Sequence, residues 1–243
     1  METSDFDFEN IYSIFEQSIT NNVDKNSYDD FLIAYSGGID STALLYFTKK
    51  IAIKYNKKIH AIHVNHNLNK DSKIWEKHCI DFCKKNGIEL ILKNVNITLK
   101  KGDSIEEKAR EARYDSIYEV MSKKTIMMTA HHLEDQSETF LYQLLRGAGA
   151  KGLSSMPIVK KLSCGYHIRP FLKFNKKIIE NIVNYNKLKF IYDFSNEDIN
   201  FSRNFIRKNI LPIIKKKWPN YADTISRSAL ILSESNKLNE DLA

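Results

Sequence analysis

A glycine-centred loop carries the residue types best suited to chemistry in this chain of 243 residues. It lies between the apolar runs 31–35 and 42–47, and its members are Ser36, Gly37, Gly38, Ile39, Asp40 and Ser41. Two adjacent glycines let the backbone curl until several N–H groups point inward, and the following helix adds the positive end of its dipole. The serine hydroxyls can donate hydrogen bonds to phosphate oxygens, and Asp40 can hold a Mg²⁺ that bridges them. The loop is therefore predicted to cradle the pyrophosphate that leaves when ATP is split at its α-phosphate.

A second group of reactive residue types lies at 129–139, where the sequence reads TAHHLEDQSET. His131 and His132 follow an apolar strand, and Asp135 and Glu138 fall at the start of the next helix. These carboxylates are three residues apart and therefore share one helix face. Compensation of the helix dipole is the alternative role for either carboxylate alone. No cysteine or third histidine stands at ligand spacing, so a zinc site is not expected.

Two arginines lie one helical turn apart in the sequence AREARY, at positions 110 and 113. Guanidinium pairs clamp phosphates through bidentate hydrogen bonds, although arginines on helices also lie solvated on the surface. Both interpretations of Arg110 and Arg113 stay open from the residues alone.

A regular alternation of strands and helices positions these residues. The expected strands are 31–35, 59–64, 89–92 and 125–129, and the expected helices are 4–20, 40–55, 71–86, 104–122 and 133–146. Ser104 and Glu107 form a capping-box pattern, and Gly147 and Gly149 end the last of these helices. Four strand–helix units in series predict an α/β fold with a doubly wound, mostly parallel sheet and ligands at the carboxyl ends of its strands.

The alternation breaks after residue 150. A hairpin-like segment at 158–168 precedes expected helices at 175–187, 201–217 and 221–238, which Pro212 and Pro219 are expected to separate. The last helix is amphipathic, with one stripe formed by Tyr221, Ile225, Ala229 and Leu232. A helical C-terminal extension is therefore predicted after the sheet-forming part of the chain.

Composition and charge limit the classes of function. Hydrophobic residues make up 42% and charged residues 28% of the chain, and the apolar runs are too short to span a membrane. Three cysteines do not form a disulfide framework, and the acidic N-terminus lacks the order of a signal peptide, so a cytoplasmic location is expected. Residues 1–150 carry a net charge of −2 and residues 151–243 carry +9. This asymmetry favours a polyanionic partner, and the alternative is a lysine-rich but merely solvated surface.

The loop after the first strand resembles the PP-loop of the N-type ATP pyrophosphatases. Seven segments in order then resemble the catalytic portion of the tRNA(Ile)-lysidine synthase family, from about residue 30 to about residue 215. They are SGGIDS, HVNHNLN (63–69), AREARY (109–114), TAHHLEDQSET (129–139), LRGAGAKGL (145–153), RPFL (169–172) and DFSNEDINFSRNFIRKNILP (193–212). The resemblance implies an adenine-nucleotide α-hydrolase-like core at 1–150, completion of the catalytic domain at 151–215, and a helical linker at 216–243 toward C-terminal domains absent from this chain.

The resemblance also implies an activity and its partners. The family uses ATP to adenylate C2 of the wobble cytidine in the CAU anticodon of an isoleucine tRNA, and the ε-amino group of free L-lysine then displaces AMP to form lysidine. The implied cofactors are ATP and magnesium. A homodimer is left open, and no membrane partner is expected.

Roles are carried over at matching positions only. Ser36 to Ser41 resemble the ATP loop, with Asp40 as the magnesium ligand. Asp135 and Glu138 match the positions that hold lysine. The residues that match positions near the nucleotide and the cytidine are Arg113, His131 and one of Arg203 and Arg207.

The sequence departs from the family pattern at three positions. Glu134 replaces an aspartate, Asn67 replaces a glycine and Asn69 replaces an arginine, which removes one phosphate contact. Three other interpretations stay open: a tRNA thiolase, a ligase that activates a small molecule with AMP, and a non-catalytic RNA-binding module. Cys79 and Cys83 are four residues apart on an expected helix, a spacing typical of buried structural thiols, which disfavours sulfur transfer.

Overall fold

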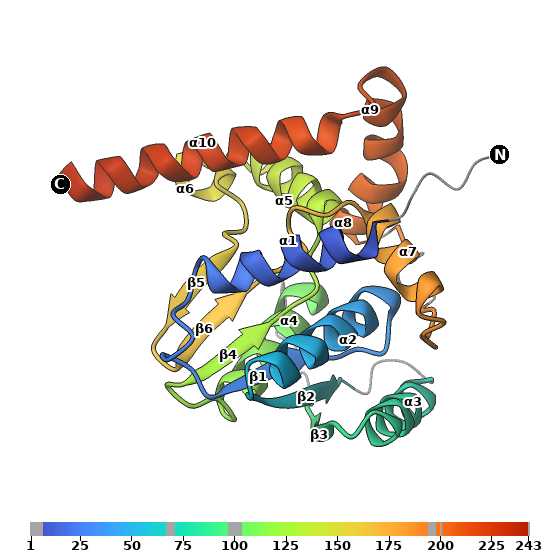
Figure 1. Ribbon diagram of the computed structural model, residues 1–243. Coiled ribbons are helices and arrows are strands. Elements are labelled where there is room, and N and C mark those ends of the chain that lie inside the picture. The colour runs from blue at the N-terminus through green and yellow to red at the C-terminus, as the bar shows by residue number, and fades with distance from the viewer. Residues whose placement is uncertain (1–6, 67–70, 97–103, 194–197, 200, 243) are drawn as a thin grey trace. The chain divides into compact units, whose positions relative to one another are not determined.

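The computed structural model describes residues 7–66, 71–96, 104–193, 198–199 and 201–242 (Figure 1). Residues 4–6 of the first expected helix, Asn67, Asn69 and the segment 194–197 lie outside the described residues. The chain forms two compact units. The sheet unit comprises residues 1–130, 159–170 and 177–192, and the helical unit comprises 131–158, 171–176 and 193–243. The functional division expected at residues 150 and 215 stays a prediction.

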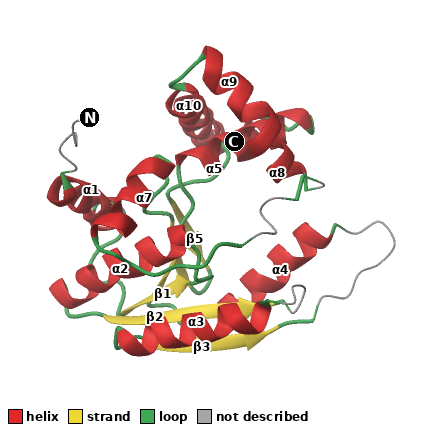
Figure 2. Ribbon diagram, turned by 90° about the vertical axis from the view of Figure 1, so that its right-hand side faces the viewer, coloured by secondary structure: helices red, strands yellow, loops and turns green. Residues whose placement is uncertain are grey.

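The sheet unit is built on six strands in the order β3-β2-β1-β4-β6-β5. Figure 2 shows β1, β2 and β3 side by side. Every pairing is parallel except that of β5 with β6, which confirms the predicted fold class. The strands are β1 (Asp30–Ala34), β2 (Lys58–Asn65), β3 (Glu89–Asn94), β4 (Thr125–Met128), β5 (Val159–Leu162) and β6 (Gly165–Ile168), and the helices are α1 (Phe8–Thr20), α2 (Ile39–Lys54), α3 (Ser72–Lys85), α4 (Ile105–Tyr118) and α7 (Lys176–Tyr185).

Strand β1 lies at the centre of the sheet because its side chains are apolar on both faces. Phe31, Leu32 and Ile33 are at most 3% exposed, as expected for a strand covered on both sides. Leu32 packs with Ile117 of α4, while its neighbours point to the opposite face. Strands β2 and β3 are added on one side of β1, whereas β4 is added on its other side. The gap between β1 and β4 is therefore the topological switch point, where ligands of such sheets bind.

The hairpin after residue 158 joins the same sheet. β6 pairs in parallel with β4, and Thr129 N donates to Ile168 O at 3.2 Å. Gly165 begins β6 with φ of +110°, and a Cβ atom there would clash with the carbonyl oxygen of Thr125. The sequence indicated a hairpin, but its place beside β4 follows from this close backbone approach, which has no signal in local periodicity.

The helical unit comprises α5 (Leu133–Leu145), α6 (Ala150–Leu153), α8 (Ser202–Phe205), a π-helical segment (Ile206–Ile210), α9 (Leu211–Lys217) and α10 (Tyr221–Leu242). Its core joins Leu133 of α5 to Ile206, Leu211, Tyr221 and Ala222. Tyr221 and Ala229 of the expected stripe on α10 are buried, and Ile225 packs against this core. None of the described helices is both long and apolar enough to cross a membrane.

Pro212 does not separate two helices, contrary to the expectation from sequence. Residues 202–217 run as one continuous helical rod whose middle part, Ile206–Ile210, is π-helical, and Pro212 lies in the first turn of α9. Proline cannot donate a backbone hydrogen bond, and its ring crowds the carbonyl four residues earlier. A widened turn just before the proline accommodates both effects without a break. Pro219 does lie between α9 and α10.

Substitution of Gly165 by alanine tests the close approach of β6 to β4. Gly165→Ala should lower the free energy of unfolding by at least about 2 kcal/mol, because the new methyl group adds a clash to the strain of positive φ. Gly87→Ala is the matched control, since Gly87 also has positive φ (+62°) but no atom within 4 Å of an added Cβ. The control should lose about 1 kcal/mol. Equal losses in urea denaturation would contradict this account of the hairpin.

Candidate functional site

The loop between β1 and α2 is held in shape by its own serines. Ser36 Oγ lies 3.1 Å from Ser41 Oγ, and Gly38 N donates to Ser36 Oγ at 3.3 Å. Ser41 Oγ is also 3.1 Å from the carbonyl oxygen of Gly38, to which it donates. The hydroxyl groups of Ser36 and Ser41 therefore fix the curl of the loop.

Gly37 has a backbone conformation and a crowded setting that require glycine. Its φ is +82°, and an added Cβ would lie 3.1 Å from Cys79 Sγ and 3.2 Å from Ile191 Cδ1. Its carbonyl oxygen accepts a hydrogen bond of 2.8 Å from Ile191 N. The loop is thus packed between α3 and the segment that follows α7, within the sheet unit.

The N-terminus of α2 is open toward the loop. Gly38 is its N-cap residue in an extended conformation and has no side chain to cap the first turn. Asp40 lies in that first turn and is half-buried. Backbone N–H groups at the start of a 16-residue helix, with the helix dipole behind them, form a site suited to anions.

Two histidines, His63 in β2 and His66 just after it, contact residues near the carboxyl ends of the strands. His63 is buried, and its Nδ1 lies 2.9 Å from the carbonyl oxygen of Tyr35. Arg113 of α4 donates from Nε to His66 Nε2 at 3.5 Å. Burial, followed by the charge of Arg113, lowers the pKa of His66 to about 4. A neutral His66 is therefore the acceptor that positions the Arg113 guanidinium.

In the helical unit, His132 begins α5 through a capping box. Its backbone N–H donates to Asp135 Oδ2 at 3.0 Å. The His132 ring contacts two carboxylates, with Nδ1 at 3.0 Å from Glu134 Oε2 and Nε2 at 3.4 Å from Asp135 Oδ2. Glu134 also accepts a bond of 3.0 Å from Lys176 N. His132 and Glu134 thus hold the start of α5, and with it Asp135, in a fixed orientation.

Arg207 joins the two carboxylates that the sequence places on one helix face. Its Nε lies 2.5 Å from Glu138 Oε1, and its Nη2 lies 2.9 Å from Glu138 Oε2 and 3.2 Å from Asp135 Oδ1. Glu138 is only 1% exposed. One guanidinium therefore bridges two carboxylates, with a bidentate contact to the buried one. Arg207 sits on the π-helical segment, a type of irregularity that is frequent at functional sites.

The two carboxylates differ in their pKa shifts. Burial raises the pKa of Asp135, but the positive charges of His132, His131 and Arg207 outweigh it, so the pKa lies below its usual value. For Glu138, burial outweighs the hydrogen bonds from Arg207, and the charge of Asp135 adds to it, so the pKa is raised. Two interacting carboxylates with opposed shifts are typical of a binding or catalytic site.

The structure brings some expected residues together and leaves others in separate units. The six loop residues and Arg113 belong to the sheet unit, while His131, Asp135, Glu138 and both arginines of 203–207 belong to the helical unit. Arg207 contacts the carboxylates, whereas the guanidinium of Arg203 lies 6.0 Å from the ring of Tyr142. The contacts of His66, His132 and Glu134 were not predicted from the sequence. The three-residue spacing of His132 and Asp135 is a capping pattern that could have been found.

A comparison with family models matches residues 11–214 to the PP-loop domain. The chain belongs to the PP-loop domain family. Curated relatives of this PP-loop chain are named tRNA(Ile)-lysidine synthase. That of Buchnera aphidicola subsp. Schizaphis graminum is 47% identical over 86% of this chain and 46% of the relative, and that of Coxiella burnetii is 40% identical over 89% and 48%. The relative from Francisella tularensis subsp. holarctica is 40% identical, and the match covers 95% of this chain and 57% of the relative. The PP-loop chain thus spans about half the length of these relatives.

A solved structure shares the fold of this PP-loop chain. The U34-tRNA thiolase NcsA from Methanococcus maripaludis with its [4Fe-4S] cluster is similar with a TM-score of 0.75. The similarity covers 93% of this chain and 78% of that one at 17% sequence identity, which supports the fold alone.

Removal of the Arg207 guanidinium should destabilise the PP-loop chain in a pH-dependent way. The pKa of Glu138 is higher in the folded than in the unfolded state, so its protonated form stabilises the fold at pH values below the unfolded-state pKa of about 4.3. This stabilisation is lost as the pH rises through the folded-state pKa. Arg207→Met deletes hydrogen bonds that oppose the rise, so the pKa of Glu138 should climb further. The variant should lose about 1 to 3 kcal/mol at about pH 8 and much less at about pH 5, measured by urea denaturation.

Arg203→Met is the control for that measurement. It removes an arginine from the same helical rod, at a position where the guanidinium faces the ring of Tyr142. Its effect on the free energy of unfolding should not change between the two pH values. A loss of equal size at both pH values in Arg207→Met would show that the charge of Glu138 is not what Arg207 stabilises.

Proposed function

We propose that this chain is the catalytic portion of a tRNA(Ile)-lysidine synthase. The observation that carries the proposal is the identity of 39–47% over most of the chain to relatives of that name. The proposed reaction has two steps. O2 of the wobble cytidine of an isoleucine tRNA attacks the α-phosphate of ATP and releases pyrophosphate, and the ε-amino nitrogen of L-lysine then attacks C2 and releases AMP. The ε-ammonium group releases two protons to solvent, one before the attack and one as the new C–N bond forms, while the C2–O bond breaks and AMP leaves with that oxygen.

The loop after β1 suits the first step. Its curled backbone and open helix N-terminus supply N–H donors to the phosphates that leave, and the two serine hydroxyls hold that curl in place. Among the described residues no group of three or more His, Cys, Asp and Glu side chains forms a cage for a metal ion. A single carboxylate at Asp40 beside a phosphate cradle fits Mg²⁺, which commonly takes one or two carboxylates together with substrate phosphates and water. Bound there, the ion would neutralise charge that develops on the leaving pyrophosphate.

The carboxylate pair of α5 suits the lysine substrate. Asp135 and Glu138 share one guanidinium, so with both carboxylates ionised and the contacting His132 ring neutral the cluster carries one net negative charge. An ammonium group from an amino acid would complete the charge balance of this buried cluster. Arg207 therefore holds the two carboxylates close together but neutralises only one of their two negative charges, so one further cation can bind.

An isoleucine tRNA is the proposed polyanionic partner. Residues 151–243 carry a net charge of +9, and the run Lys215–Lys217 is exposed at the end of α9. Exposed lysines displace counterions from phosphates and so favour RNA binding. A homodimer and a cytoplasmic location stay predictions.

The burial of the cysteines disfavours sulfur transfer. Cys79 and Cys83 lie inside the sheet unit at no more than 1% exposure. Burial raises the pKa of both thiols, to about 12 for Cys83. A reactive cysteine needs an accessible thiolate, so these two have the properties of structural thiols.

Substitutions in the loop test the ATP chemistry. Asp40→Ala should abolish AMP formation and leave the melting temperature nearly unchanged, because it removes the proposed magnesium ligand from a half-buried position. Ser36→Ala should weaken the same step less, since it removes neutral hydrogen bonds worth about 1 kcal/mol each. Radiolabelled ATP, with tRNA and lysine present, gives the readout. Release of ADP and phosphate by the wild type would contradict the mechanism.

Substitutions in the carboxylate pair test the lysine site. Glu138→Gln and Asp135→Asn should raise the KM for lysine by tenfold or more, on the order of 1.4 kcal/mol, and leave the affinity for ATP nearly unchanged. Asp223→Asn is the control, because this carboxylate belongs to the same helical unit but is exposed in the first turn of α10. It should keep the KM for lysine. Loss of ATP binding with an unchanged KM for lysine would assign the pair to the metal site instead.

A further inference from the structure

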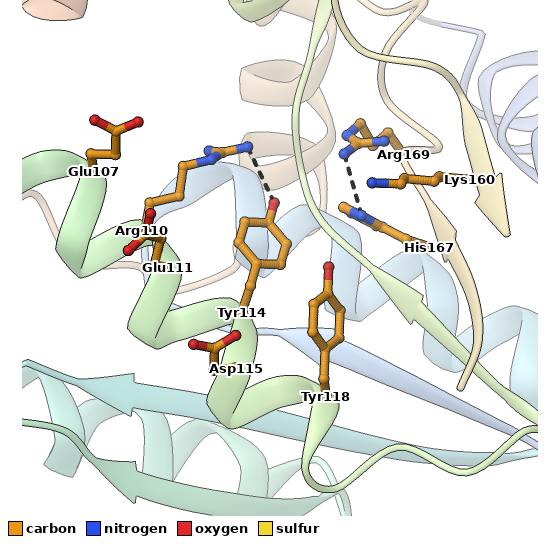
Figure 3. A pocket seen from close by; sticks show the side chains of 9 residues that line it. All are labelled: Glu107, Arg110, Glu111, Tyr114, Asp115, Tyr118, Lys160, His167 and Arg169. Carbon is orange, nitrogen blue, oxygen red and sulfur yellow. Dashed lines mark hydrogen bonds between the residues drawn. The ribbon is translucent and has the colours of Figure 1, made fainter. Parts of the chain in front are cut away.

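A cavity of about 410 Å³ lies in the sheet unit, between α4 and the β5–β6 hairpin (Figure 3). We call it the hairpin pocket and define it by Arg110, Tyr114, Tyr118, Lys160, His167 and Arg169. Figure 3 shows the polar ends of these six side chains directed toward a common space. Its volume is in the range of sites that bind small ligands. The reaction proposed above assigns no role to any of the six.

Two sequence motifs without an assigned role meet in this pocket. Arg110 and Tyr114 belong to AREARY, in which only Arg113 was given a function, and Arg169 begins RPFL. These motifs are more than fifty residues apart in the chain. The pairing of β6 with β4 brings them to the same cavity.

The inner wall of the hairpin pocket is a fixed arrangement of hydrogen-bond donors. Arg169 and His167 are only 6% and 2% exposed. Arg169 Nη2 lies 3.2 Å from His167 Nδ1, and His167 Nε2 lies 2.8 Å from Thr129 Oγ1. A guanidinium can only donate, so Nδ1 is the acceptor and Nε2 carries the proton of a neutral imidazole. His167 therefore orients the buried arginine without neutralising its charge.

The outer wall adds aromatic rings and further cations. Arg110 stacks over the ring of Tyr114, with 5.0 Å from Cζ to the ring centroid, and its Nη2 is 3.5 Å from the tyrosine hydroxyl. The rings of Tyr114 and Tyr118 are 5.8 Å apart, and Lys160 approaches from β5. Aromatic faces next to guanidinium groups are the features that proteins use to hold unpaired bases and their phosphates.

Three carboxylates on α4 also line the pocket, but they lie at its solvent side. Glu107, Glu111 and Asp115 are all exposed, and Glu111 pairs with Lys108 at 2.8 Å. Exposed charges are screened by water and salt, whereas the charge of buried Arg169 is screened much less. The interior of the pocket therefore favours an anion despite the balanced number of charges.

We propose that the hairpin pocket binds one nucleotide of the RNA substrate, with its phosphate held by Arg110, Lys160 and Arg169 and its base placed against Tyr114 and Tyr118. This inference rests on the proposed function and adds a second contact point for the same RNA. A free nucleotide has the same phosphate and base, so the experiment tests both an RNA and a free nucleotide as the ligand.

Lys160 and Lys161 provide a matched pair of variants. Both are exposed and adjacent on β5, but successive residues of a strand point to opposite faces, and only Lys160 lines the pocket. Binding of an anticodon stem-loop RNA to the 243-residue chain is measured over a range of salt concentrations. Lys160→Met should weaken binding about threefold to tenfold and reduce the slope of log K against log salt by about 0.7 to 0.9. Lys161→Met should leave both unchanged.

Arg169→Met tests the inner wall and should weaken RNA binding at least about tenfold. Circular dichroism establishes whether this variant is folded. If it is not, Arg110→Met replaces it, because Arg110 is half-buried and is assigned to the same phosphate, and a similar weakening of RNA binding is expected. Calorimetry with AMP forms the second arm. A loss of AMP affinity in Lys160→Met but not in Lys161→Met, with RNA binding intact, would assign the pocket to a free nucleotide and overturn the RNA assignment.

Two results separate this inference from the proposed function. If Lys160→Met behaves like Lys161→Met toward both RNA and AMP, the inference is wrong even when the wild type forms lysidine. If the wild type binds no stem-loop RNA, the proposed function and the RNA assignment both fail, and the AMP arm then decides whether the pocket holds a phosphate at all.

Discussion

Parallel pairing of β1 with both β2 and β4 is the constraint on which the sheet unit depends. It places the carboxyl ends of three strands at one edge, and after β1 Tyr35 N still donates to Ile62 O of β2 before the turn begins at Ser36. Because Phe31, Leu32 and Ile33 are buried on alternating faces, a shift of register would exchange side chains between two packed layers and disrupt both, so it is strongly disfavoured. The curl at Gly37 and the open N-terminus of α2 are therefore presented on a rigid support.

In the helical unit, the buried carboxylate of Glu138 is held by a bidentate contact with Arg207. Glu138 would be costly to bury alone, and Arg207 reduces that cost while it also reaches Asp135. Their orientation is set from the other side by the His132 cap and by Glu134. Breaking such an arrangement at one member leaves another charge without compensation, so the members act as a group rather than as independent contacts.

Much of this fold could be predicted from the sequence because the local signals for strands, turns and helix caps agreed with the overall alternation of strands and helices. Strand runs such as 31–35 and 59–64, the Gly-Gly turn and the cap at Ser104 all favoured alternating strands and helices, and Ser104 does accept from Glu107 N. The contacts between distant residues could not be predicted. The bridge from Arg207 to Glu138 spans 69 residues, and the place of β6 beside β4 depends on Gly165. Such pairings are decided by tertiary packing, which leaves no period in the sequence.

The π-helical segment lets the helical rod tolerate the loss of one residue at that place. A π turn contains one residue more than an α turn would need. Each residue of a regular α-helix turns the side-chain direction by about 100°, so a deletion there rotates one flank against the other by that angle. Deletion of the extra residue within Ile206–Ile210 would instead let the wide turn close to an α turn and leave α8 and α9 nearly in phase. A one-residue deletion within α9 has no such wide turn to absorb it and would rotate the residues after it relative to Arg207.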